Sequence, residues 1–510
     1  MELFLLNCDT WVTPQTLDWL EECQAATYVL NTPPENLRNR VQKLNTISEA
    51  NAVKMLSGMS HRLKVMTNGE AAYHWLAQHL PEDHLLMEQI NVCARKSIFR
   101  KVCEDAFPKD VQTMTARLSG GNEVEFFADR TSQTNGGDFS DGESELSDND
   151  EIEGHGTSKE EQVTLPKDPG YQSNFARKTS VEVCEDLLEN MGSTVSERAK
   201  WIVKPSRGFC AVGVSRFSVI AHQQDNDALA LRDFVASQMG RRNTFLVESY
   251  IDGPQYTCDG YFDAQGDPKI ITVSFAPKYD SHDIREIMLG TNAALMQEQL
   301  PLAKAMMMRL QTSASALFCR GRADTASSSP RFFRNFPFMV EYRVVQGTKS
   351  KDRTSKKAVP IEVNALRHEG KSPTYSQLIH STPLYDFFFK DLGDGDADAM
   401  RAHMMKAFAD KRRSVCVADV PEYNEEMVAA MIFARKPSEE FLAHNINYAK
   451  WVGHLRGLSV SSGSPLAHEE RFAHSNGNFF FGVAMGYFPR WSALDEFLVP
   501  NFEEQFIIQD

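Results

Sequence analysis

Apolar positions in the first ninety or so residues follow two different spacings. Short apolar runs typical of strands occur at Leu3–Leu6, Ala26–Leu30 and Leu63–Met66. Glu70–Leu80 instead carries apolar residues at helical spacing. Alternating strand and helix patterns favour an α/β layer with a mostly parallel sheet. We therefore expect residues 1–90 to form an N-terminal α/β domain.

A second helical pattern follows this region. Ile98, Val102 and Ala106 recur at every fourth position, and Pro108 is expected to stop the helix. Lys96 stands at the beginning of this pattern.

Trp201–Val214 has the pattern of a strand, a small turn and a second strand. The first strand leads to Lys204, and the turn contains Gly208 and Gly213. Glycine lets the backbone approach a ligand closely, so this turn is predicted to be a flap whose N–H groups close on phosphates. A compact lysine ammonium would neutralise phosphate charge. An ordinary β-hairpin with a surface lysine is the alternative interpretation.

Two oxygen-bearing side chains stand two positions apart in a later strand-like run. These are Glu362 and Asn364, and Ile361 and Val363 are expected to point to the other, buried face. Alternate residues of a strand leave the same face, so the pair could share a hard cation such as Mg²⁺. Two polar side chains facing solvent are the alternative.

The order of the motifs resembles that of the ATP-grasp superfamily. The chain has Lys-Pro…Gly at 204–208, Glu-x-Tyr-Ile at 248–251, and Glu341 followed by Glu-x-Asn at 362–364. The resemblance covers approximately Lys96 to Tyr385. It implies an α/β fold of three parts: the N-terminal domain of residues 1–90, a two-lobed α+β ATP-grasp domain of residues 91–385, and a C-terminal extension of residues 386–510.

The same resemblance implies roles for particular residues. The phosphates would be contacted by Lys96, Lys204, Ser206 and Gly208. The segment beside adenine would be Glu248, Ser249, Tyr250 and Ile251, acting mostly through backbone groups, with Gln255 at the ribose. Glu341, Glu362 and Asn364 would hold Mg²⁺ or Mn²⁺, and Arg367 would grip a substrate carboxylate in a bidentate fork.

Three positions depart from the superfamily pattern or compete within it. Gln255 stands where relatives often have a glutamate, and Arg95 replaces the usual acid before Lys96. Lys178 is the rival to Lys96 as the first phosphate-contacting lysine, but it precedes Lys204 by too few residues for the subdomain that normally intervenes.

The resemblance implies an ATP-dependent carboxylate–amine ligase. Its substrates would be a small carboxylate and an amine, with amino acids expected, joined as an amide or peptide through an acyl phosphate. No Gly-x-Ser-x-Gly elbow, complete Gly-x-x-x-x-Gly-Lys-Ser/Thr phosphate loop or kinase His-Arg-Asp set occurs. Two alternatives stay open: a non-catalytic nucleotide-binding regulatory or scaffold protein, which Gln255 and Arg95 would suit, and a ligase that uses a thiol nucleophile.

Charge is concentrated in one segment of the chain. The net charge is −15, and residues 138–161 contain ten acids against one lysine, so the remainder is only mildly acidic. Nucleic acid is therefore not an expected partner. Thr131–Glu161 is too poor in apolar residues to bury a core, so it is predicted to be a disordered insertion. Two further insertions, Arg320–Arg334 and Lys349–Lys357, are expected at hairpin tips.

Cysteine spacing and hydropathy bear on the cellular location. The nine cysteines form no Cys-x-x-Cys pair, which favours reduced, mostly buried thiols over a zinc site. No stretch of eighteen apolar residues and no basic leader occurs, so neither a membrane span nor a signal peptide is predicted, and a cytoplasmic protein is expected. The sequence leaves open whether residues 386–510 cover the active site or contact another copy in a homo-oligomer.

Overall fold

The computed structural model describes part of the 510-residue chain. The described residues are 2–5, 26–29, 45–58, 63–67, 70–81, 83–108, 110–111, 113–118, 124–129, 175–178, 198–205, 215–220, 244–276, 288–319, 331–346, 356–366, 375–376, 379–382, 384–414, 426–435, 460–461 and 480–497. Ser206, Gly208, Arg367 and the acidic insertion 131–161 lie outside these ranges.

A parallel four-stranded sheet occupies the N-terminal region, as its alternating pattern predicted. Its order is β3-β2-β1-β4, with β1 (Glu2–Leu5), β2 (Ala26–Val29), β3 (Asn45–Thr46) and β4 (Leu63–Met66). Helices α3 (Glu49–Ser57) and α4 (Glu70–His79) accompany it.

A six-stranded antiparallel sheet contains the two strands that flank the predicted flap. Its order is β7-β6-β5-β10-β8-β9, with β5 (Thr113–Leu118), β6 (Val124–Asp129), β7 (Phe175–Lys178), β8 (Arg198–Pro205), β9 (Ser215–Ile220) and β10 (Thr244–Ser249). Strands β8 and β9 pair in antiparallel fashion from Val203 opposite Ser215 outward. The two predicted strands are confirmed, and the turn between them, residues 206–214, lies outside the described residues.

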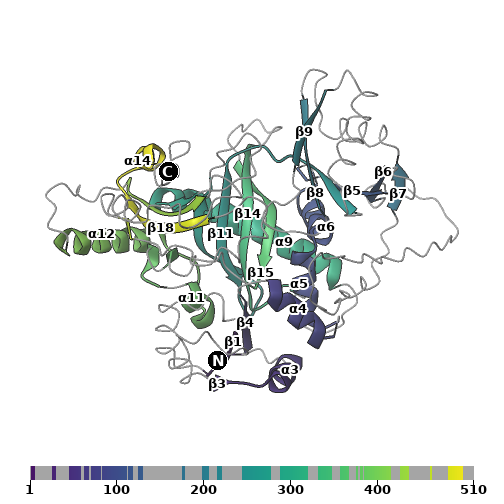
Figure 1. Ribbon diagram of the computed structural model, residues 1–510, viewed down its shortest axis with the longest axis horizontal. Coiled ribbons are helices and arrows are strands. Elements are labelled where there is room, and N and C mark those ends of the chain that lie inside the picture. The colour runs from purple at the N-terminus through teal and green to yellow at the C-terminus, as the bar shows by residue number, and fades with distance from the viewer. Residues whose placement is uncertain are drawn as a thin grey trace, which may run out of the picture.

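An eight-stranded antiparallel sheet forms the centre of the molecule (Figure 1). Its order is β15-β14-β11-β12-β13-β16-β18-β17, with β11 (Gln255–Phe262), β12 (Pro268–Phe275), β13 (Met288–Thr291), β14 (Phe336–Gln346), β15 (Lys356–Ala365), β16 (Val428–Arg435), β17 (Val460–Ser461) and β18 (Phe480–Phe488). Strands β16 to β18 come from the expected C-terminal extension. That region therefore continues the central sheet.

Helices cover the central sheet and join it to its neighbours. The long α9 (Ala293–Phe318) packs on β12 and β15, and α6 (Lys96–Ala106) packs on α9. Helix α5 (Leu85–Ala94) packs on β15. The C-terminal half adds α11 (Leu384–Lys390), α12 (Ala397–Ser414) and α14 (Trp491–Phe497). None of the helices that the structure describes combines the length and apolar character needed to cross a bilayer.

The N-terminal layer is tied to the end of β15 by two hydrogen bonds. The Thr67 amide donates to the Leu366 carbonyl at 2.9 Å, and the Tyr73 hydroxyl donates to the Ala365 carbonyl. Leu366 has a φ of 52°, a left-handed conformation that a leucine adopts only when its surroundings hold it there. The first layer thus fixes the backbone just after the Glu-x-Asn motif.

The apolar stripe of helix α6 is buried to different degrees along its length. Val102 is buried, but Ile98 and Ala106 are only partly buried. The inner face is instead made by Phe99 and Cys103 together with the charged residues of the same helix, Lys96 and Arg100. The helix is confirmed, and the burial of its two charged side chains depends on partners from other elements.

Arg320–Arg334 was expected to be a polar insertion, but the end of this segment belongs to the core. Phe332 and Phe333 are buried, at 0% and 5% exposure. Gln311 on α9 donates to the Phe333 carbonyl at 2.8 Å and accepts from its amide at 2.9 Å. The expectation was wrong at these residues because a buried glutamine satisfies the loop backbone and lets both rings pack.

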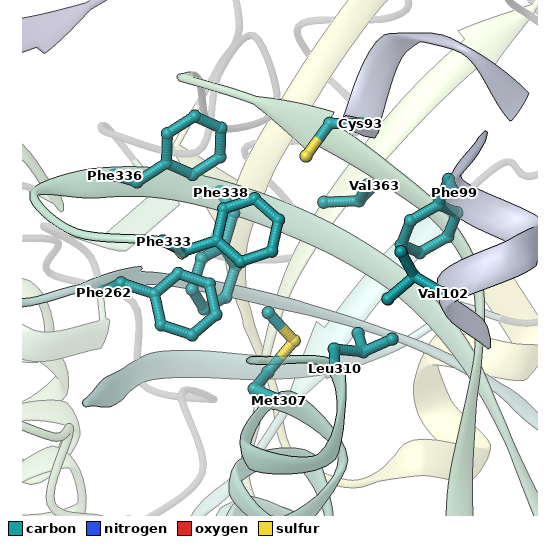
Figure 2. Close-up of a pocket in the computed structure, with 10 residues that line it drawn as sticks. All are labelled: Cys93, Phe99, Val102, Phe262, Met307, Leu310, Phe333, Phe336, Phe338 and Val363. Atoms are coloured by element: carbon teal, nitrogen blue, oxygen red, sulfur yellow. The ribbon is translucent and has the colours of Figure 1, made fainter. Parts of the chain in front are cut away.

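A small apolar cavity lies between β15, α6 and α9 (Figure 2). Its volume is about 10 Å³, and its lining has no polar side chain beyond a thiol: Cys93, Phe99, Val102, Phe262, Met307, Leu310, Phe333, Phe336, Phe338 and Val363. A space of this size without polar partners does not hold an ordered water. Val363 belongs to this lining, so the inner face of β15 rests on a dry, close-packed core.

Truncating a ring in this core should be costly. We expect Phe338→Ala to lower the free energy of unfolding by about 3–5 kcal/mol, because the lost ring enlarges a cavity that cannot be filled by water. Urea unfolding followed by tryptophan fluorescence would measure the shift. Leu392→Ala is the control, since Leu392 is 51% exposed and its loss should change the stability by less than about 0.5 kcal/mol. Equal shifts for both variants would contradict the packing described.

Candidate functional site

A buried carboxylate, that of Glu248 at the end of β10, stands at the centre of the candidate site. Arg100 on α6 places Nη2 3.1 Å from Glu248 Oε1 and Nε 2.6 Å from Oε2, the second being a close ion-pair contact without hydrogen-bond alignment. Lys204 on β8 places Nζ 2.5 Å from Oε1. Their exposures are 5% for Glu248, 2% for Arg100 and 5% for Lys204. Three separate elements therefore meet in one desolvated ion cluster.

Arg100 also connects this cluster to the strand that carries the predicted metal ligands. Its Nη1 donates to the Pro360 carbonyl of β15 at 2.9 Å. Two positions further along β15, Glu362 Oε2 lies 4.0 Å from Lys96 Nζ. Lys96 and Arg100 are four residues apart on α6, so they leave the same face of the helix. Helix α6 thus places one cation beside Glu248 and another beside Glu362.

The pKa values of Lys204 and Glu248 reflect burial together with the charges around them. Burial, helped by the nearby Arg100 charge, lowers the pKa of Lys204 to about 8. Burial alone would raise the pKa of Glu248, but Arg100 and Lys204 outweigh it and hold that pKa below its ordinary value. Burial is the main cause of the lowered pKa of Lys204. The pKa of Glu248 is lowered in spite of burial, because this one carboxylate faces several cations. Three cations and the carboxylates of Glu248 and Glu362 leave one net positive charge, which suits an anionic ligand.

Two carboxylates stand directly opposite each other at the second half of the site. Glu341 on β14 is in register with Glu362 on β15. Like charges directly opposite in a sheet are destabilising unless a cation lies between them. Asn364 follows on the same face as Glu362, opposite Met339, and its amide Nδ2 lies 3.9 Å from the Met339 sulfur.

This oxygen set fits a hard cation. Within the described ranges, no three His, Cys, Asp or Glu side chains gather into a metal cluster. A divalent ion here would therefore use the two carboxylates and the Asn364 amide oxygen, with phosphate or water oxygens in its remaining positions, as Mg²⁺ usually does.

A bulge interrupts β15 directly before Glu362. The register shifts by one residue between Glu341 and Tyr342, so Ile361 has no partner opposite it. Val363 is buried as expected, but Ile361 is only partly buried, because the extra residue interrupts the alternation. Bulges commonly re-aim side chains at active sites.

The segment predicted to lie beside adenine is held by Arg343 of β14. Its Nη1 donates to the Ile251 carbonyl at 3.2 Å and to the Tyr250 hydroxyl, and its guanidinium lies over the Tyr250 ring at 4.6 Å. Ser249 donates its hydroxyl to the Asp110 carbonyl at 3.2 Å. The side chains of Glu248 and Tyr250 thus make specific contacts within the protein, in a segment that was expected to act mostly through its backbone groups.

The break between β10 and β11 requires glycine. Gly253 has a φ of 136°, and a Cβ at this position would lie 2.2 Å from the Val344 carbonyl oxygen. The close approach allows the Val344 amide to donate to the Pro254 carbonyl at 3.1 Å. It brings the start of β11, and with it Gln255, against β14.

The structure brings most of the predicted residues that it describes into one connected region. Contacts and strand register link Lys204, Glu248, Lys96, Glu362 and Glu341, and the Gln255 amide Nε2 donates to Glu341 Oε2 at 2.7 Å. Ser206, Gly208 and Arg367 lie outside the described residues, so their roles stay predictions.

The position of β7 bears on the choice between Lys96 and Lys178. Lys178 ends β7, which is separated from β8 by four strand spacings, roughly 19 Å at the usual interval. Lys96 instead lies within the site. This placement favours Lys96, although the phosphate role of either lysine stays a prediction.

Two arginines of the site, Arg100 and Arg343, were missed by the sequence reasoning. Each could have been found by spacing: Arg100 follows Lys96 by one helical turn, and Arg343 follows Glu341 by two strand positions. A charged residue on the same face as a candidate ligand is the signal that was available.

The comparisons with known proteins bear on the segment that carries Lys204 and Glu248. Residues 197–318 match a family model described as an ATP-grasp domain. The match begins one residue before β8 and ends with α9. The expectation of an ATP-grasp domain in this part of the chain is confirmed. Strands β14 and β15 lie beyond the match, and no curated protein sequence matches the chain.

Several solved structures resemble the chain distantly. The L-amino acid ligase from Bacillus licheniformis has a TM-score of 0.48 and 12% identity, covering 100% of this chain and 98% of that chain. Phosphoribosylglycinamide synthetase from Anaerococcus prevotii has a TM-score of 0.47 and 10% identity, covering 98% and 96%. N5-carboxyaminoimidazole synthetase from Staphylococcus aureus, complexed with ADP, has a TM-score of 0.47 and 8% identity, covering 97% and 95%. Scores below 0.5 do not indicate a substrate.

Removing Arg100 should destabilise the protein through the charge it leaves behind. We expect Arg100→Met to lower the free energy of unfolding by about 3–5 kcal/mol, because a buried carboxylate loses its main partner. The double variant Arg100→Met, Glu248→Gln should lose much less than the sum of the two single variants, as chemical unfolding of all three would show. Lys390→Met is the control, because its pair with Asp386 is 52% exposed on the lysine side and contributes at most about 1 kcal/mol. Additive losses would argue against the ion cluster.

Proposed function

We propose that this chain is an ATP-dependent ligase that joins a small carboxylate to an amine, with amino acids as the expected substrate class. One observation carries the proposal: a buried cluster with net positive charge leads, through Arg100, to a strand whose carboxylate faces a second carboxylate across the sheet. The first half suits the phosphates of a nucleotide, and the second suits the divalent ion that accompanies them. The ATP-grasp match over residues 197–318 supports this assignment.

The phosphate-binding half would work by exchange of ion-pair partners. In the structure Lys204 pairs with Glu248, and a bound phosphate oxygen would compete with that carboxylate for the ammonium. Glu248 would keep Arg100 as its partner, so the exchange leaves no buried charge uncompensated. Lys96 would approach the phosphates from the side of Glu362.

The metal-binding half would be formed by Glu341, Glu362 and Asn364. A divalent ion bound there would neutralise charge that develops on the transferred phosphoryl group. The chain's own part is to keep two carboxylates opposite each other on adjacent strands, next to the bulge at Ile361.

The reaction would proceed in two displacements. A carboxylate oxygen of the substrate attacks the γ-phosphorus of ATP, which forms an acyl phosphate and releases ADP. The amine nitrogen then attacks the acyl carbon, phosphate leaves, and the nitrogen loses a proton. Arg367, which follows the Leu366 turn, would hold the substrate carboxylate as the resemblance implies. No protein nucleophile is required, so positioning and charge neutralisation would supply the rate enhancement.

Nucleotide affinity should fall as the pH rises through the pKa of Lys204. That pKa is lowered to about 8, so the ammonium is fully protonated well below pH 8 and is lost above it. If only the protonated lysine binds phosphate well, the Kd for ADP rises towards about tenfold per pH unit above pH 8. Isothermal titration calorimetry should also detect proton uptake on binding in this range. Lys204→Arg should remove both effects, because arginine stays charged. A flat wild-type profile from pH 7 to 9.5 would contradict the assignment.

Turnover should depend on Glu362 and on a divalent ion. With ATP, Mg²⁺ and pooled amino acids, we expect release of phosphate together with a condensed product detectable by mass spectrometry. Glu362→Gln should reduce the rate by about 100-fold or more, because an amide replaces a charged ligand. Glu298→Gln is the control, since Glu298 is 51% exposed and pairs with an exposed lysine. Tight ATP binding without any release of ADP would instead support a non-catalytic nucleotide-binding protein.

A further inference from the structure

Gln255 has an unusual pair of neighbours. It begins β11, is 5% exposed, and lies directly opposite Arg343 of β14. Glu341 is two residues from Arg343 on that strand and is therefore diagonal to Gln255 on the same face. Diagonal neighbours in an antiparallel pair are within reach of long side chains.

Both ends of the Gln255 amide are engaged. Nε2 donates to Glu341 Oε2 at 2.7 Å, and Oε1 accepts from Arg343 Nη2 at 3.5 Å, the longer and weaker of the two bonds. The direction of the amide follows from its neighbours. A guanidinium can only donate and an ionised carboxylate can only accept, so the oxygen faces Arg343 and the nitrogen faces Glu341.

Only a side chain with a donor and an acceptor can make this bridge. A glutamate at position 255 would place a second carboxylate within hydrogen-bond distance of Glu341, where the two negative charges repel. A methionine of similar length would make neither bond. The glutamine found where ATP-grasp sequences often have a glutamate is therefore the residue type that its two neighbours require.

We infer that Gln255 is a positioning residue for the metal-binding carboxylate of Glu341, in place of the ribose contact expected from sequence. The inference rests on the proposed function. Arg343 is itself anchored on Tyr250 and the Ile251 carbonyl, so it holds Gln255, and Gln255 in turn holds one oxygen of Glu341. Residues that orient a metal ligand in this way commonly change metal affinity by 10–100-fold when replaced.

The test compares metal affinity with nucleotide affinity in Gln255→Met. The probe is Mn²⁺ in the presence of ADP, followed by electron paramagnetic resonance. We expect Mn²⁺ to bind about 10–100-fold more weakly than to the wild type. The Kd for ADP in EDTA should change by no more than about twofold, and the preference for ATP over 2′-deoxy-ATP should not change. The control is Gln89→Met, which removes the 2.7 Å bond from a buried glutamine to the Phe332 carbonyl and should leave Mn²⁺ affinity unaltered.

Two results would overturn the inference in distinguishable ways. Unchanged Mn²⁺ affinity with a lost preference for ATP over 2′-deoxy-ATP would restore the ribose role and leave the proposed function intact. A wild-type protein that binds neither ADP nor Mn²⁺ would remove the proposed function and this inference together. If Gln255→Met does not fold, Gln255→Asn serves instead, because its shorter amide does not reach Glu341, and the same loss of Mn²⁺ affinity is expected.

Discussion

The buried carboxylate of Glu248 is the constraint on which the rest of the site depends. An ionised carboxylate is tolerated in a desolvated position only where cations and hydrogen bonds compensate it, and here Arg100 and Lys204 do so from two different elements. Because Arg100 also binds the Pro360 carbonyl, the same ion cluster sets the distance between β10 and β15. The geometry of the proposed phosphate-binding half and that of the proposed metal-binding half are therefore coupled through one arginine.

The two faces of β15 differ in what they contact: one packs against the apolar core, and the other carries the predicted metal ligands. Val363 points to the dry cavity beside Phe99 and Val102, and that close packing leaves the strand little freedom to move (Figure 2). Glu362 and Asn364 leave the other face, where Glu341 stands opposite. Helix α6 shows the same division, with Phe99 and Cys103 in the core and Lys96 and Arg100 directed to the charged groups. Rigid apolar support on one side keeps like charges close together on the other.

Local sequence patterns predicted the structure correctly where a single physical effect determined it. Periodicity predicted the strand beginning at Leu63 and the common face of Glu362 and Asn364. Proline chemistry predicted that the helix ends before Pro108. Prediction failed where partners distant in sequence changed the outcome. Phe332 and Phe333 end a segment that reads as a polar loop, but Gln311 satisfies the Phe333 backbone and both rings are buried. Ile361 is only partly buried beside a bulge that only the pairing with β14 reveals.

The sequence by itself determined the parallel N-terminal layer, the order of the ATP-grasp motifs and the residue types that could bind phosphate and a divalent ion. Only the tertiary structure decided that the Glu248 side chain pairs with Arg100 and Lys204, and that Gln255 bridges Arg343 to Glu341. The reason is physical: periodicity and turn chemistry depend on neighbours a few residues away. The state of a buried charge or amide depends instead on which donor or acceptor the fold brings to it, here from residues about 90 to 150 positions along the chain.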